Sequence, residues 1–325
     1  MKTLYIIVTD QCQMRCPFCY VNFVPSFDNN LVSSSETPKN VSHIDPELVY
    51  KVIKKGEYDL AVFHGGEPLL YPQVLLDIMD RCKDLNVNFS IQSNLAFKQL
   101  SPKQLEAISR LNSIGTSYSY DRFAHCKQQE LYFISNVKEL KSIGIGVSSL
   151  ITVTESQINY QNPYALKDYI DELGVDQIHF ERVIMPLKEL EEDKVRLEVM
   201  YKEIDKYLRT CYEIFPKDKT TLYSLVRNSI VYRRPFYDTA CSNHTHTLYP
   251  DKLKYGCPTL EKRNVVDTKM DKCLECRWFK WCGGDCECFN HVCAFPSLLF
   301  ERVIKDLKQE MKEETLLLLN IRSNV

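Results

Sequence analysis

Three cysteines near the start of the chain carry the clearest chemical signal in the sequence. They are Cys12, Cys16 and Cys19, spaced C-x3-C-x2-C directly after an apolar run at residues 4–8. Three soft ligands in one short loop can face a single metal centre. A closed structural zinc site needs four ligands, so three thiolates suit a four-iron cluster that leaves one iron open. The alternatives are thiols that are merely buried, or that bind zinc with a distant fourth ligand.

A second field of cysteines lies between positions 241 and 293. A C-x2-C-x5-C-x3-C run stands inside it, and pairs spaced C-x2-C are common in zinc modules, so zinc is the plainest alternative here. Without a secretion signal, 14 cysteines indicate metal ligands rather than disulfides. The members of this field are Cys241, Cys257, Cys273, Cys276, Cys282, Cys286, Cys288 and Cys293.

Composition limits the class of protein. A length of 325 residues suggests one large domain or two ordinary ones, and 44% hydrophobic with 26% charged residues is typical of a globular protein. The formal net charge of -2 argues against a general binder of nucleic acid or of anionic membranes. We find no signal peptide and no apolar stretch long enough to span a bilayer. We therefore expect a cytoplasmic protein with no nucleic-acid and no membrane partner.

Strand and helix patterns alternate between the two cysteine fields. Repeated βα units imply a parallel sheet with right-handed crossovers. We therefore predict an α/β fold, a partial (β/α)6 barrel, followed by a small Cys-rich domain that carries a β-hairpin at 249–256 and helices. The strands predicted after residues 4–8 are 60–64, 88–92, 117–120, 146–153 and 177–183, and the helices are 46–55, 74–85, 102–111, 130–143, 163–173, 187–215 and 217–235. The predicted domains are a barrel at 1–186, a helical connector at 187–235 and the Cys-rich domain at 236–325.

Polar and small residues follow the predicted strands, at the edge where chemistry gathers in parallel α/β folds. Two glycines after the second strand would let the backbone approach a ligand, and the carboxylate of Glu67 could accept hydrogen bonds from an ammonium group. At the ends of the third and fourth strands, turn chemistry is an equal alternative. The residues concerned are Gly65, Gly66, Glu67, Pro68, Ser93, Asn94 and Asp121.

With Tyr20 after its third cysteine, the first loop resembles the signature of the radical SAM superfamily, and Gly65 to Pro68 is similar to the family's GGE motif. The resemblance implies a [4Fe-4S] cluster on Cys12, Cys16 and Cys19, whose open iron binds S-adenosyl-L-methionine (SAM). It implies reductive cleavage of SAM to a 5'-deoxyadenosyl radical that abstracts hydrogen. The cofactor-binding residues that it implies are Tyr20, Gly65, Gly66, Glu67, Pro68, Ser93, Asn94 and Asp121.

The second field resembles the SPASM domain, which holds two auxiliary [4Fe-4S] clusters in certain radical SAM enzymes. The resemblance assigns one set of ligands to the outer cluster and another to the inner one. Cys288 is surplus and could replace the last outer ligand or complete the inner set. The outer set is Cys273, Cys276, Cys282 and Cys293, and the inner set is Cys241, Cys257 and Cys286.

Two positions depart from the SPASM pattern. Some relatives carry a further cysteine shortly after the position of Cys241, where this chain has His244 and His246. We interpret these histidines as surface residues of the hairpin. The alternatives for the inner cluster are then an open iron, a histidine ligand or a ligand from the substrate. Sulfatase-maturating relatives carry an Asp directly after the hairpin cysteine, and Pro258 stands there in this chain. The missing carboxylate argues against sulfatase maturation.

SPASM enzymes resemble one another in acting mostly on peptides and proteins. The resemblance implies an oxidoreductase that matures a ribosomally made peptide by forming a thioether or carbon-carbon crosslink, with flavodoxin or ferredoxin as electron donor. Because the chain begins at its first predicted strand, we expect a separate leader-binding protein, or leader binding by strand addition. The alternatives are a radical SAM oxidase or epimerase on another substrate, and a non-catalytic zinc-binding module. No residue is assigned as catalytic.

Overall fold

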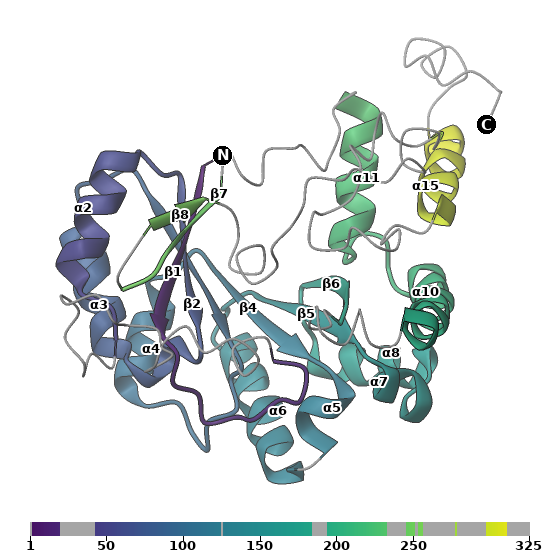
Figure 1. The fold of residues 1–325 in the computed structure, drawn as a ribbon, viewed down its shortest axis with the longest axis horizontal. Coiled ribbons are helices and arrows are strands. Elements are labelled where there is room, and N and C mark those ends of the chain that lie inside the picture. Colours follow the sequence, from purple (N-terminus) through teal and green to yellow (C-terminus); the bar gives the residue numbers. More distant parts are fainter. Residues whose placement is uncertain are drawn as a thin grey trace.

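The strands and helices of this protein build one curved layer of sheet with helices along its outer side (Figure 1). The structure is a computed structural model, and it describes residues 2–19, 43–124, 126–183, 194–232, 245–250, 253–255, 277 and 297–310. Within these ranges, no helix is both long and apolar enough to cross a membrane.

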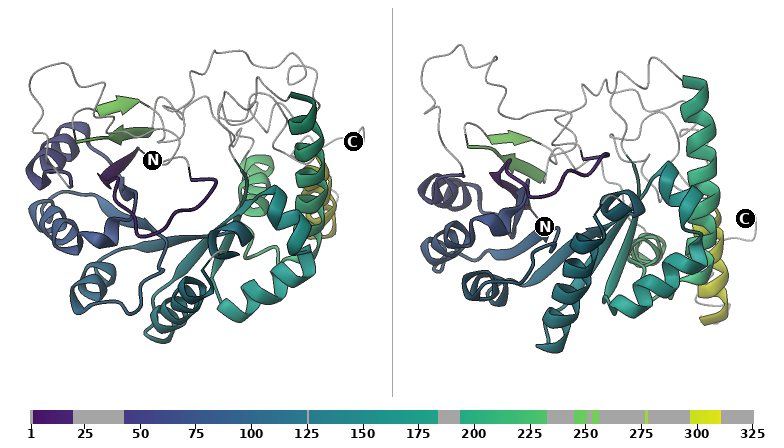
Figure 2. Two further views of the ribbon diagram at one scale, coloured as in Figure 1. Left: turned by 60° about the horizontal axis from the view of Figure 1, so that its bottom comes forward. Right: turned by 90° about the horizontal axis from the view of Figure 1, so that it is seen from below.

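Eight strands form a single sheet in the order β6-β5-β4-β3-β2-β1-β7-β8. All neighbours are parallel except β7 and β8, which are antiparallel. The sheet is curved and open, with helices outside it (Figure 2), which confirms the predicted α/β partial barrel. The strands are β1 Thr3–Thr9, β2 Leu60–Gly65, β3 Asn88–Ser93, β4 Ser113–Tyr118, β5 Val147–Val153, β6 Gln177–Arg182, β7 Thr245–Leu248 and β8 Leu253–Tyr255.

Local signals fix where the helices begin. Asp45 caps α2 by accepting a backbone N–H, and Ser101 and Gln104 cap α4 reciprocally. Proline occupies the first turn of α2, α3, α4 and α8, where its missing N–H costs no hydrogen bond. The helices are α2 Pro46–Gly56, η1 Pro68–Leu70, α3 Pro72–Arg81, α4 Pro102–Ser109, α5 Tyr120–Ala124, α6 Lys127–Ser142, α7 Glu155–Tyr160, α8 Pro163–Leu173, α10 Lys194–Ile214, α11 Thr221–Tyr232 and α15 Ser297–Glu310.

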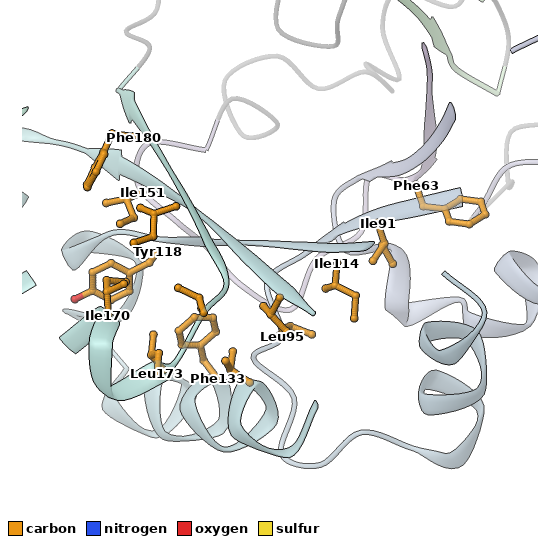
Figure 3. Close-up of a cluster of buried hydrophobic side chains, with 14 of the residues drawn as sticks. Phe63, Ile91, Leu95, Ile114, Tyr118, Phe133, Ile151, Ile170, Leu173 and Phe180 are labelled. Carbon is orange, nitrogen blue, oxygen red and sulfur yellow. The ribbon is translucent and has the colours of Figure 1, made fainter. Parts of the chain in front are cut away.

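The main core lies between the sheet and the helices (Figure 3). Along β5, Val147, Ser149, Ile151 and Val153 are buried, while the residues between them are half-buried. On β6, the ring of Phe180 packs against helix α10, with its centroid 5.5 Å from that of Tyr212. Because side chains alternate across a strand, the half-buried residues of β5 face the concave side of the sheet. Partly exposed side chains therefore line the concave side of β5.

Several predicted elements are shifted: the helix predicted at 74–85 is α3, Pro72–Arg81, and two strands also differ. The fourth strand was expected at 117–120, but β4 runs from Ser113 to Tyr118, and residue 120 begins α5. Ser119 explains the change because its hydroxyl accepts the N–H of Arg122 and turns the chain into the helix. The predicted hairpin at 249–256 is present, but its first strand, β7, ends at Leu248. The short helices η1, α5 and α7 were not predicted.

The first strand of the hairpin belongs to the barrel sheet, because β7 pairs in parallel with β1. His246 lies opposite Leu4 in this pairing and is only 7% exposed. Its Nδ1 atom contacts the hydroxyl of Tyr58, and the two rings meet edge to face. The interpretation of His246 as a surface residue is therefore wrong, whereas His244 lies outside the described residues. The domain divisions at 186/187 and 235/236 stay predictions.

Candidate cofactor site

The cysteine loop leaves the C-terminal end of β1 and folds back on itself. The N–H of Cys19 donates to the carbonyl of Cys16 at 3.1 Å. The guanidinium of Arg15 donates to the carbonyl oxygens of Cys12 and Met14 at 3.0 and 3.3 Å. Met14 and Cys16 are buried, at 4% and 7% exposure, so they anchor the loop in the core. The loop is therefore held in a compact turn by its own backbone.

The three thiols lie close enough to affect one another's ionisation. Burial raises the pKa of Cys12 to about 11, and the charges of Glu67, Cys16 and Cys19 raise it further, against a hydrogen bond from the N–H of Met14. Burial also raises the pKa of Cys16, while the guanidinium of Arg122 lowers it. Cys12 and Cys16 are therefore protonated at neutral pH in the metal-free protein, and metal binding would release their protons.

The two glycines after β2 lie against the backbone that leads into the cysteine loop. The N–H of Gly66 donates to the carbonyl of Thr9 at 2.6 Å, and that of Glu67 donates to Gln11 at 2.8 Å. A Cβ atom on Gly65 would lie 2.4 Å from the Thr9 oxygen, and one on Gly66 would lie 2.3 Å from the Gln11 oxygen. Gly65 also has φ +125°. The close approach seen in the structure is thus to the cysteine loop, and contact of these glycines with SAM stays a prediction.

The carboxylate of Glu67 joins the β2 and β3 loops. Its side chain is fully buried, and it accepts hydrogen bonds from Leu69 N–H at 3.0 Å, Ser93 hydroxyl at 2.9 Å and Asn94 N–H at 2.7 Å. Burial raises its pKa to about 7, although these donors and the charge of Arg122 lower it. Its predicted contact with the ammonium group of SAM stays a prediction. Pro68 follows it at the buried start of η1.

Asn94 connects β3 to the cysteine loop directly. Its side-chain amide donates to Cys12 Sγ at 3.5 Å and to Gln13 Oε1 at 3.3 Å. Its carbonyl oxygen accepts from Gln13 Nε2 at 2.9 Å and from the N–H of Ala96 at 2.8 Å. These hydrogen bonds fix the orientation of the Asn94 amide group. Its side-chain N–H donates to Cys12, a predicted cluster ligand.

The end of β4 adds a cation to the site. Arg122, in α5, donates to the carbonyl of Ser117 at 2.9 Å, and its charge lowers the pKa of Cys16. The predicted residue Asp121 precedes it in the first turn of the same helix and is half-buried. The sequence analysis missed Arg122 and Gln13. The signal that could have indicated Arg122 as a site residue is its position directly after Asp121, at the C-terminal end of a predicted strand.

Not every predicted site residue can be placed. Parallel pairing of β1 with β2 and β2 with β3 brings together the loops that carry the first cysteines, the glycine turn and Asn94. The other predicted ligands and contacts lie outside the described residues. They are Tyr20, Cys241, Cys257, Cys273, Cys276, Cys282, Cys286, Cys288 and Cys293.

The donor set fits a four-iron cluster. Three thiols come from one loop, and Asn94 supplies a hydrogen bond to one of the sulfur atoms, as is usual around iron-sulfur ligands. In the part of the chain that the structure describes, no three Cys, His, Asp or Glu side chains converge as they would around one metal ion. A cluster places each thiolate on a different iron, so Cys12, Cys16 and Cys19 are the residues that would hold it.

Comparison with known proteins points to the same site. The sequence model of the radical SAM superfamily matches residues 6–125, which run from β1 to the turn after α5. This stretch holds the three cysteines, the glycine turn, Asn94 and Arg122. Residues 6–125 are therefore similar to a radical SAM domain. This family implies a [4Fe-4S] cluster and SAM, the same cofactors that the sequence interpretation expects.

The relatives vary in how much they share with this chain. An uncharacterised protein of Methanocaldococcus jannaschii is 24% identical over 84% of this chain and 90% of its own length. The radical SAM cyclopropyl synthase TigE of Paramaledivibacter caminithermalis is 25% identical over 34% of this chain. An uncharacterised protein of Archaeoglobus fulgidus is 24% identical over 36%. The chain spans a quarter of the length of each of the last two.

Proposed function

We propose that this protein is a radical SAM enzyme that modifies a peptide or protein, forming a thioether or carbon-carbon crosslink in a ribosomally made peptide. One observation carries the proposal: the radical SAM domain places Cys12 and Cys16 of the loop beside Asn94 and Arg122, with Glu67 buried behind them. When bound, the cluster and SAM would supply an electron and a radical that abstracts hydrogen. The organic chemistry belongs to these cofactors, and the protein positions them.

The residues of the chain have separate tasks in this proposal. The three thiolates hold the cluster, and the Asn94 amide orients Cys12 through its hydrogen bond to Sγ. The glycine turn clamps the start of the loop through its two backbone hydrogen bonds. Burial of Cys16 at 7% exposure shields one side of the loop from water. A shielded site protects a reactive radical from side reactions.

The concave side of the sheet supports a substrate site opposite the cluster loop. Hydrogen-bond register places Ser117 of β4 beside Leu150 of β5, and Leu150 beside His179 of β6. These three residues share the concave face and are half-buried. A wall of mixed polar and apolar groups suits a peptide, whose backbone needs hydrogen-bond partners and whose side chains need apolar contacts.

The second cysteine field is proposed to hold two auxiliary clusters that accept an electron from the substrate or position it. The β7–β8 hairpin supports this, because it is part of the barrel sheet and ends two residues before Cys257 in the sequence. Flavodoxin or ferredoxin is proposed as the electron donor, and a separate protein as the leader binder. The name of the cyclopropyl synthase relative favours carbon-carbon bond formation among the possible reactions.

The direct test is reductive cleavage of SAM. Anaerobically reconstituted protein with a low-potential reductant should release 5'-deoxyadenosine, and the triple variant Cys12→Ala, Cys16→Ala, Cys19→Ala should release none, because no ligand would hold the cluster. Cys82→Ala is the matched control, since Cys82 is also buried, at 1% exposure, but lies at the end of α3. Persisting cleavage in the triple variant would refute the site.

Mass spectrometry separates the proposed reaction from its alternatives. A candidate precursor peptide is coexpressed with the protein and then analysed intact. A crosslink removes two hydrogen atoms from the peptide, an epimerisation leaves its mass unchanged, and oxidation of a side chain leaves no new link between residues. Zinc in the purified protein with no SAM cleavage would instead support the non-catalytic zinc module.

A further inference from the structure

Arg122 lies in α5, directly after β4. Among the contacts of the described residues, it is the charged side chain of α5 that contacts both the end of β4 and the cysteine loop. Its Cζ atom lies 6.0 Å from the centre of the Phe18 ring, and Phe18 stands between Cys16 and Cys19 in the loop. Its Nη1 atom donates to the carbonyl of Ser117 at 2.9 Å. The guanidinium thus lies between the end of the strand and the loop.

One of the five N–H donors of this guanidinium is enclosed by the protein. Its Nε atom is buried and has no hydrogen-bond partner among the described residues. A buried N–H without a partner normally costs free energy, which a partner at the site would recover.

A second arginine in the loop provides a contrast. The guanidinium of Arg15 donates to the carbonyl oxygens of Cys12 and Met14, and its side chain is exposed. Water and salt strongly screen the electrostatic interactions of an exposed charge, whereas those of a half-buried charge are screened less. Of the two arginines, Arg122 is therefore the one whose charge acts on the cysteine thiolates of the loop.

We propose that Arg122 is a positioning residue that balances the negative charge of the cluster at Cys16 and so makes the cluster easier to reduce. The inference rests on the proposed function, because it concerns the cluster that the three cysteines would hold. Reduction adds one electron and makes the cluster more negative. A neighbouring cation stabilises that form, and hydrogen bonds and charges near the ligand sulfurs are known to set cluster potentials.

The test is a redox titration of the reconstituted protein, followed by the electron paramagnetic resonance (EPR) signal of the reduced cluster. Arg122→Gln should move the midpoint to lower potential, with a roughly tenfold lower ratio of reduced to oxidised cluster at a fixed potential, since a neighbouring opposite charge shifts such an equilibrium by about that much. Arg122→Lys keeps the charge and should retain most of the wild-type ratio. Arg110→Gln is the control, because Arg110 pairs with Asp80 on the outer helices.

The outcomes separate this inference from the proposed function. Wild-type protein that takes up no cluster refutes both. Wild-type protein that holds the cluster while Arg122→Gln keeps its midpoint refutes the role of Arg122 alone. If Arg122→Gln fails to fold, as shown by circular dichroism, the Lys variant decides. A folded Arg122→Lys protein whose ratio of reduced to oxidised cluster is also tenfold lower would refute the role of the charge.

Discussion

Glu67 shows how one buried side chain organises three loops. Its carboxylate receives three hydrogen bonds, from Leu69, Ser93 and Asn94, and Asn94 in turn contacts Cys12. Loss of one partner in such a network leaves buried donors unsatisfied. The side chain that the sequence suggested as a ligand contact is thus also the support of the loops that carry the other contacts.

Glu67 also makes stability depend on pH. Burial raises its pKa from 4.5 to about 7, so the folded protein retains a proton that the unfolded chain loses between these values. Stability should therefore fall as pH rises from about 4.5 to about 7 and then level off, by on the order of 3 kcal/mol from this group. In Glu67→Gln this contribution should be absent.

Urea unfolding of the metal-free protein, under reductant at several pH values, measures the effect. Glu106→Gln on the exposed surface of α4 is the control and should keep the wild-type pH dependence. An unchanged slope in Glu67→Gln would contradict the assignment. Near pH 7, Glu67→Gln should also lose more stability than the exposed control variant does. The reason is that the new side-chain N–H faces the backbone N–H of Asn94, which is also a donor.

At the scale of elements, the glycine turn and the cysteine loop act as one unit. Gly66→Ala would place a Cβ atom 2.3 Å from the Gln11 carbonyl, which is backbone and cannot rotate away. We expect a loss of about 1–3 kcal/mol in stability and a lower iron content after reconstitution, because the loop must shift. Gly146→Ala is the matched control, since its Cβ would lie 3.5 Å from Asp176 Oδ2, an ordinary contact.

Unfolding midpoints and iron analysis of both variants test this coupling. Equal stability and equal iron content in Gly66→Ala and Gly146→Ala would mean that the turn and the loop are independent. A Gly66→Ala protein that is less stable but still takes up full iron would mean that the turn supports the fold without shaping the ligand loop.

Sequence patterns predicted the elements that repeat and missed those fixed by single contacts. Hydrophobic runs gave β2, β3, β5 and β6 within one residue at most bounds, and the starts of α2, α4 and α8 agree with the predicted ranges. The limits of β4 were missed because the Ser119 hydroxyl, rather than periodicity, ends the strand. The role of Arg122 was missed because it depends on Cys16, a residue distant in sequence.

At the scale of the whole molecule, the C-terminal part is joined to the barrel through β7. No local pattern near residues 245–248 reveals that this strand pairs with β1, because the partner lies more than two hundred residues earlier. The contact between His246 and Tyr58 adds a side-chain link at this seam. Burial and then the charge of Lys2 lower the pKa of His246, so the neutral ring is favoured.

A double-mutant cycle on Tyr58→Phe and His246→Gln should measure this link. We expect a coupling free energy of about 1 kcal/mol, the usual net value of one hydrogen bond. The reading is urea unfolding at neutral pH, with Tyr50→Phe as the control for loss of an exposed-helix hydroxyl on α2. Additive effects of the two substitutions would show that the buried contact does not help to fasten β7 to the barrel.

The central claim is that the cysteine loop holds a cluster with one open iron that binds SAM. The most direct measurement is the EPR spectrum of the reduced, reconstituted protein before and after addition of SAM. We predict a [4Fe-4S] signal that changes when SAM is added. The triple variant Cys12→Ala, Cys16→Ala, Cys19→Ala should lose this response. A wild-type protein with no cluster signal, or with a signal that SAM leaves unchanged, would contradict it.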